Sequence, residues 1–123
     1  MVEIHRASDA ELKGGLGYGV RYVADLTFRE PLESSGFIIV KIPPEMKTSP
    51  HSHSVLTEVF VIMSKTRMGV SETVYDLNEG DVVVVEHGES HWFETPSGPD
   101  VDVIAVKMPN LKDDKVEEQR DKL

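Results

Sequence analysis

Three histidines and one glutamate are spaced so that they could bind a single metal ion. His51 and His53 are two residues apart, so on an extended strand both rings point to the same face. Glu58 follows five residues later, so a turn or bulge over residues 54–57 must return it to the histidines on a second strand. His91 comes much later, after a valine-rich strand and a short turn. Imidazoles and a carboxylate together make a mixed nitrogen and oxygen site for a divalent transition metal.

The spacing of these residues resembles the two sequence motifs of the cupin superfamily. The first motif reads His-x-His-x4-Glu, and the second runs from Gly80 through Gly88 to a histidine. The resemblance covers residues 37–108 and implies an all-β fold, the double-stranded β-helix or jelly-roll barrel. It also implies that one metal ion is bound at the four matching positions, which are His51, His53, Glu58 and His91.

The chain departs from the family pattern at four positions, all of them turn or barrel-edge positions. It has Glu45 and Lys65 where the family often has glycine, Glu86 in place of proline, and Thr95 in place of asparagine. None of these positions is a predicted ligand. The departures therefore affect which subfamily the chain resembles, and they change none of the predicted metal ligands.

Four protein ligands leave one or two positions open on an octahedral ion. Such a site suits Fe(II), Mn(II), Ni(II) or Zn(II), because ligand type alone does not choose among these metals. An open position can polarise a carbonyl or bind a hydroxyl or carboxylate group. The resemblance implies a metal-dependent enzyme of the dioxygenase, isomerase or decarboxylase type, acting on a small oxygenated organic molecule. The alternative is a non-catalytic module that binds a metal or small ligand, since no catalytic residue beyond the ligands is evident.

Phe93 is the remaining candidate site residue. It lies two residues after His91, so on a strand both side chains point to the same side and Phe93 is expected on the wall of a pocket beside the metal. Trp92 then points the other way, into core packing or a subunit contact.

Motifs for other kinds of chemistry are missing from the sequence. The chain lacks the His-Glu-x-x-His motif and the nucleophile elbow, and its glycine cluster at 14–19 fits no phosphate-binding loop.

The rest of the chain is a series of short apolar runs that could position these side chains. Turn residues separate the runs, which is typical of a β-sandwich or barrel. The valine run at 82–85 lacks polar alternation, which predicts a strand covered on both faces. We expect a lead-in over residues 1–19, one barrel domain over 20–108, and a charged tail over 109–123 that is solvated or a short frayed helix.

Composition narrows the classes of partner. The 123 residues suit one domain, and the net charge of −9 opposes binding to nucleic acids and to anionic membranes. The chain has no cysteine, which excludes disulfides and thiolate ligands. The N-terminus lacks the apolar core of a signal peptide, so a cytoplasmic location is the default expectation.

We expect the protein to bind a small molecule and to form a homodimer. In the dimer, residues 20–28 would join or cover the edge of a neighbouring sheet.

Overall fold

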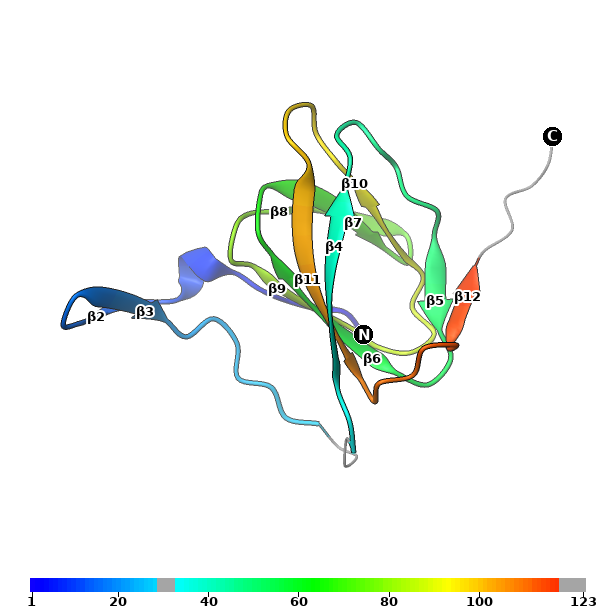
Figure 1. The fold of residues 1–123 in the computed structure, drawn as a ribbon, viewed down its shortest axis with the longest axis horizontal. Coiled ribbons are helices and arrows are strands. Elements are labelled where there is room, and N and C mark those ends of the chain that lie inside the picture. Colours follow the sequence, from blue (N-terminus) through cyan, green and yellow to red (C-terminus); the bar gives the residue numbers. More distant parts are fainter. Residues whose placement is uncertain (29–32, 118–123) are drawn as a thin grey trace.

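Two antiparallel β-sheets facing each other make up most of the molecule (Figure 1). The computed structural model describes residues 1–28 and 33–117, and within these ranges there is no α-helix. Sheet 1 has the strand order β1 (Glu3–His5), β9 (Val82–Val85), β6 (Thr57–Ile62), β11 (Val101–Met108) and β4 (Gly36–Ile42). Sheet 2 has the order β12 (Lys115–Glu117), β5 (His51–His53), β10 (His91–Glu94), β7 (Thr66–Val70) and β8 (Thr73–Leu77). The all-β prediction is confirmed.

The apolar core lies between the two sheets. Strand β11 shows how it is built, because Val101, Val103 and Ala105 alternate along the strand and are all buried. Strand β9 is buried on both faces, since Val83 and Val84 are successive residues and both are almost fully covered, as the unbroken valine run predicted. The core cluster contains Ile42, Phe60, Ile62, Met68, Val70, Leu77, Val83, Val85, Phe93, Val101, Val103 and Ala105.

Both ends of the chain contribute strands that lie outside the predicted 20–108 domain. Strand β1 pairs with β9, with Ile4 opposite Val83. Strand β12 pairs with β5 at the edge of sheet 2, with Val116 opposite Ser52. Residues 115–117 therefore form an edge strand, and the frayed helix expected near the C-terminus is absent from the described residues. Residues 118–123 of the predicted tail lie outside the described residues.

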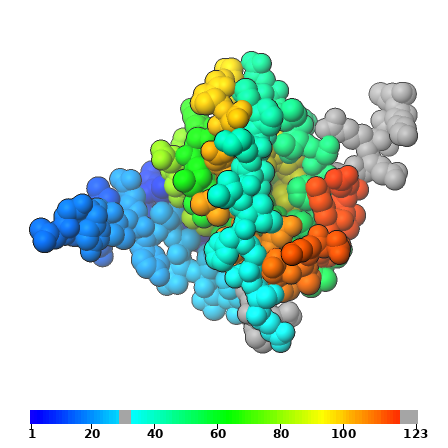
Figure 2. All heavy atoms as spheres, in the orientation of Figure 1, coloured from blue at the N-terminus to red at the C-terminus, as the bar shows by residue number. Residues whose placement is uncertain are grey.

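A separate hairpin stands away from the two sheets. It consists of β2 (Leu12–Gly15) and β3 (Tyr18–Arg21), after a short 3-10 turn at Ala7–Asp9 (Figure 2). Most of the run at 20–28 is therefore not a strand, because β3 ends at Arg21 and residues 22–28 have no regular structure. No helix in the described chain has the length and apolar character needed to cross a membrane.

Turn geometry agrees with the motif glycines, and it shows the conformation or contacts of two residues that depart from the family pattern. Gly80 and Gly88 have φ angles of 87° and 81°, in the left-handed region that glycine adopts without steric cost. Glu45 also has a positive φ of 54°, at a position where the pattern that the chain resembles often has glycine. Thr95 is buried, and its hydroxyl donates to the Pro43 carbonyl at 2.6 Å and accepts the Met46 N–H at 2.9 Å. It thereby ties the loop after β4 to the end of β10.

Candidate metal centre

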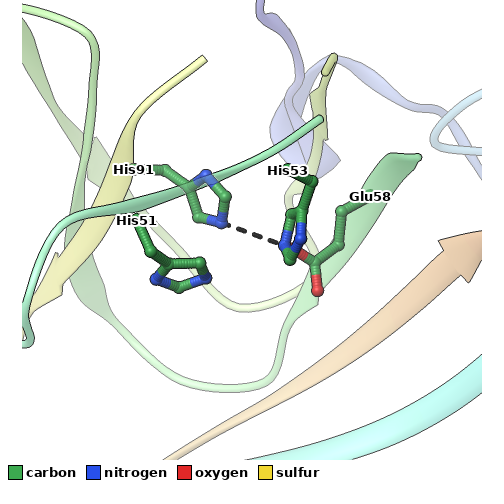
Figure 3. A group of neighbouring side chains, drawn as sticks. All are labelled: His51, His53, Glu58 and His91. Carbon is green, nitrogen blue, oxygen red and sulfur yellow. Dashed lines mark hydrogen bonds and ion pairs between the residues drawn. The ribbon is translucent and has the colours of Figure 1, made fainter. Parts of the chain in front are cut away.

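The structure brings all four predicted ligands together, from both sheets (Figure 3). His51 and His53 lie on β5, and His91 begins β10 directly opposite His51 in the antiparallel register. Glu58 comes from β6 in sheet 1, so it approaches the histidines from the facing sheet. The connector of residues 54–56 carries the chain from one sheet to the other, and this crossing brings Glu58 back to the two histidines of β5.

The four side chains form a compact and largely buried group. Their potential ligand atoms all lie within 4.8 Å of one another. Glu58 Oε1 is 3.0 Å from His53 Nε2 and 3.3 Å from His91 Nε2. His53, Glu58 and His91 are buried, whereas His51 is half-buried and marks the side nearer to solvent. A small ligand would therefore approach the group from the His51 side.

Backbone carbonyls fix the orientation of all three imidazole rings. His53 Nδ1 lies 3.1 Å from the Asp114 carbonyl, His91 Nδ1 lies 3.0 Å from the Glu89 carbonyl, and His51 Nδ1 lies 3.5 Å from the Ser49 carbonyl. A carbonyl oxygen can only accept, so in each neutral ring the proton resides on Nδ1. The Nε2 lone pairs then face the centre of the group, as in metal-ligating histidines whose other nitrogen donates to a carbonyl.

The polar atoms at the centre fit a cation. With Nδ1 donating to a carbonyl, the Nε2 atoms of His53 and His91 face the Glu58 carboxylate, and either a proton on Nε2 or a bound cation would satisfy polar atoms this close together. His91 Nε2 is buried and, although 3.3 Å from Glu58 Oε1, has no hydrogen-bond partner among the described residues. Bonds of about 2.1 Å to one metal ion place adjacent ligand atoms roughly 3 Å apart, which matches both distances to Glu58.

Electrostatics keep His51 and Glu58 in the protonation states that bind a metal. Burial, reinforced by the positive charge of neighbouring groups, lowers the pKa of His51 to about 4. Burial alone would raise the pKa of Glu58, but the close contacts of its carboxylate with the His53 and His91 rings outweigh burial and lower that pKa to about 2. At neutral pH the chain therefore offers a neutral His51 and an ionised Glu58. These are the forms that coordinate a metal.

The metal-free protein is expected to lose stability as the pH falls from 6.5 toward 2. Both folded-state pKa values are depressed, so the unfolded chain binds protons first, at His51 between about pH 6.5 and 4 and at Glu58 between about 4.5 and 2. Urea unfolding at several pH values measures this slope, and His51→Gln should flatten its upper part. An unfolding free energy that stays constant or rises between pH 6.5 and 4 would contradict the burial of His51.

Two aromatic rings connect the centre to the core. Phe60 lies edge-on to His91 with ring centroids 5.6 Å apart, and edge-on to Phe93 at 5.5 Å. Phe93 is buried in the core cluster behind Phe60, so its place on a pocket wall stays a prediction. Trp92 points away from the core and packs over Gly69, where a Cβ would lie 2.1 Å from the indole ring.

A polar cleft of about 580 Å³ lies at the far end of sheet 2 from the metal centre. Its lining includes Arg67 and Glu94, which are opposite each other at one end of the β7–β10 pair, whereas His91 is at the other end. None of the four predicted ligands lines this cleft, and neither does Phe93. The cleft is therefore separate from the metal centre.

Sequence reasoning missed Asp114, which lies in the stretch that we expected to be a charged tail. Its carbonyl orients His53, and its carboxylate accepts backbone N–H groups from residues 54–56. No periodicity or motif marks this aspartate, because its partners are about 60 residues away in the sequence. Glu89, which sequence reasoning also did not assign to the site, orients His91 through its carbonyl.

Comparison with known proteins supports the fold through structure rather than sequence. No protein-family model and no curated protein matches the chain. An uncharacterised conserved protein with a double-stranded β-helix domain from Klebsiella pneumoniae superposes with a TM-score of 0.63 at 16% identity, covering 71% of this chain and 76% of that one. A dTDP sugar isomerase from Desulfovibrio desulfuricans superposes with a TM-score of 0.69 at 10% identity, covering 98% of this chain and 85% of that one.

Part of a larger enzyme has the same architecture. An oxalate decarboxylase from Lactobacillus farciminis superposes with a TM-score of 0.61 at 17% identity, and the match covers 68% of this chain but only 26% of the decarboxylase. At these identities the comparisons establish the fold, and the fold does not determine the reaction. The facing antiparallel sheets and these superpositions lead to one conclusion: the chain has the double-stranded β-helix fold of the cupin proteins.

Proposed function

We propose that the chain is a metal-dependent enzyme that acts on a small oxygenated organic molecule. The observation that carries the proposal is the convergence of three Nε2 atoms and one carboxylate, with a buried Nε2 of His91 that no protein group hydrogen-bonds. The ligands of one divalent ion would be His51, His53, Glu58 and His91. Bound there, Fe(II), Mn(II), Ni(II) or Zn(II) would supply a Lewis acid with an open position for a substrate oxygen.

The site favours a small ligand that carries oxygen donors. Its half-buried side is at His51, and an open position on a hard or borderline ion prefers carboxylate, hydroxyl or carbonyl groups. Two of the superposed structures are named as a sugar isomerase and an oxalate decarboxylase, and both names refer to oxygen-rich small molecules. We therefore propose a reaction of the isomerase, decarboxylase or dioxygenase type.

Turnover by the metal-loaded protein is the direct test. We expect activity in a screen of sugars, sugar phosphates, keto acids and catechols, run with Fe(II) and Mn(II) while oxygen uptake is recorded. Glu58→Gln should lower that activity by about 100-fold or more, because a misplaced reacting centre costs on this scale. Glu72→Gln is the matched control, since Glu72 is exposed in the β7–β8 turn. Ligand binding without turnover across the screen would identify a non-catalytic binding module instead.

We also propose that the chain forms a homodimer through sheet 1. Its outer strand β4 has no strand on its free edge within the described residues, and Phe37 and Ile39 on it are 75% and 77% exposed. An apolar edge strand of this kind is a template for another strand, and a second copy of β4 offers the same antiparallel edge. Charged side chains and prolines usually protect such edges, and on β4 the only residue of this kind is Lys41, which pairs with Asp102.

Light scattering is expected to report twice the monomer mass at micromolar concentration. Ile39→Lys should convert the protein to a monomer, because it places a charge in the centre of the apolar edge. Leu16→Lys is the control, since Leu16 is fully exposed on the separate hairpin rather than on β4. A wild-type monomer at high micromolar concentration would contradict the dimer, and dissociation by Leu16→Lys instead would place the contact on the hairpin.

A further inference from the structure

Asp114 binds three successive backbone amides next to the metal centre. Its Oδ1 accepts the Ser54 N–H at 3.1 Å, and its Oδ2 accepts the Val55 and Leu56 N–H groups at 2.8 and 2.9 Å. Successive amides that converge on one anion form a concave nest, which holds the anion and fixes the backbone conformation. The anion here is part of the protein, and the fixed backbone is the connector between two predicted ligands, His53 and Glu58.

The same aspartate also orients one of those ligands directly. Its carbonyl accepts the Nδ1 proton of His53 at 3.1 Å. Strand β12 begins at the next residue, and Lys115 lies opposite His53 in the β5–β12 pairing. Side chain, carbonyl and following strand therefore hold β5 and the connector from one position near the C-terminus (Figure 1).

The connector would have few other restraints without this contact. Ser54 and Val55 are exposed, and only Leu56, which is 1% exposed, is anchored in the interior. The two ligands on either side of the connector come from different sheets, so its conformation sets the 3.0 Å separation between His53 Nε2 and Glu58 Oε1. The hydrogen bonds from these amides, which outweigh burial, lower the pKa of Asp114 and so favour its ionised form.

We propose that Asp114 is a positioning residue for the metal centre. Its carboxylate fixes the conformation of the connector at 54–56, and its carbonyl keeps a proton on Nδ1 of His53. The proposal rests on the metal site of the proposed function, but it requires no particular reaction. It assigns the C-terminal segment that ends in β12 a role in metal affinity. That segment would therefore be needed for tight binding even though it supplies no ligand.

Calorimetric titration with Mn²⁺ near neutral pH tests the affinity part. Asp114→Asn turns one acceptor oxygen into a donor that faces backbone N–H groups, so the nest cannot re-form. We expect binding to weaken about 10- to 100-fold, the usual cost of losing a partner that orients a ligand. Asp113→Asn removes the same charge from the exposed neighbouring residue and should leave the affinity within about twofold. Equal affinities for the two variants, or an equal loss in both, would overturn the proposal.

Nitrogen-15 NMR of the metal-free protein tests the tautomer part without any metal. His53 Nδ1 should carry a proton in wild-type protein and in Asp113→Asn. Asp114→Asn keeps the backbone carbonyl but frees the connector that holds His53 against it, so His53 should lose the Nδ1 proton in part of the population. Protonation of His53 Nδ1 that is unchanged in Asp114→Asn would overturn the positioning role. A wild-type chain that binds no Mn²⁺ would refute the proposed function, and the tautomer result would still decide the role of Asp114.

Folding of the variant is checked by circular dichroism and thermal unfolding. Water can reach the Ser54 and Val55 amides once the carboxylate is lost, so we expect the sheets of Asp114→Asn to form. If they do not, Asp114→Glu is the second variant, because it keeps the charge but shifts the carboxylate by one methylene. It should bind Mn²⁺ more weakly than Asp113→Glu, and equal affinities would overturn the proposal.

Discussion

Replacing His91 with alanine is expected to weaken Mn²⁺ binding by more than about 100-fold, which exceeds the cost of losing a residue that only orients a ligand. His91 is fully buried, its Nδ1 is held by the Glu89 carbonyl, and its Nε2 has no hydrogen bond in the described structure. No other described side chain stands in position to replace it, since the group comprises only His51, His53, Glu58 and His91. Calorimetric titration measures the loss of Mn²⁺ affinity, and the metal content that remains after gel filtration gives an independent check.

His87→Ala is the matched control for this experiment. His87 is exposed in the turn before β10, only four residues from His91, and contributes no atom to the group. Its replacement should leave Mn²⁺ affinity unchanged. His53→Ala should behave like His91→Ala, because His53 is the other buried imidazole of the group and its Nε2 lies 3.0 Å from Glu58 Oε1. Wild-type affinity in both variants, with the fold intact by circular dichroism, would show that the metal site is assigned to the wrong residues.

Local spacing was enough to predict that the four side chains lie together, because each step involves short-range geometry. His51 and His53 share a face through the two-residue period of a strand, and a short connector is sufficient to return Glu58 on the next strand. The left-handed φ of Gly80 and Gly88 likewise follows from turns that need glycine. The alternation along β11 then identifies which face of sheet 1 is covered.

The contributions of the two chain ends could not be predicted from such spacing. Strand β12 is exposed along its whole length, so it carries no apolar alternation that would mark it as a strand. Its pairing with β5 and the contacts of Asp114 join segments about 60 residues apart, and only the folded chain brings them together. The prediction of a strand over residues 20–28 was wrong for the opposite reason, because its local signal was strong but the fold does not use it. Its β-forming residues suggested a strand, but only Val20 and Arg21 belong to β3.

Replacing Phe60 with alanine is expected to lower the free energy of unfolding of the metal-free protein by about 3–5 kcal/mol. Phe60 is 3% exposed, lies in β6 at the centre of sheet 1, and contacts both Phe93 and His91 through edge-on rings. Its removal leaves a cavity that the neighbouring β-branched side chains cannot fill. A domain of this size has a total stability of about 5–15 kcal/mol, so the loss would be a large share of it.

Urea unfolding of the metal-free protein measures this loss, with Tyr22→Ala as the control. Tyr22 is an aromatic residue of similar size but is 75% exposed outside the two sheets, so its replacement should cost less than about 0.5 kcal/mol. The variant should also bind Mn²⁺ more weakly, because Phe60 supports the ring of His91 from the core side. A cost below about 1 kcal/mol for Phe60→Ala would contradict the packing described here. If Phe60→Ala loses the expected stability but binds Mn²⁺ with unchanged affinity, the backbone carbonyl of Glu89 is sufficient to orient His91. Packing by Phe60 would then stabilise the fold without contributing to metal affinity.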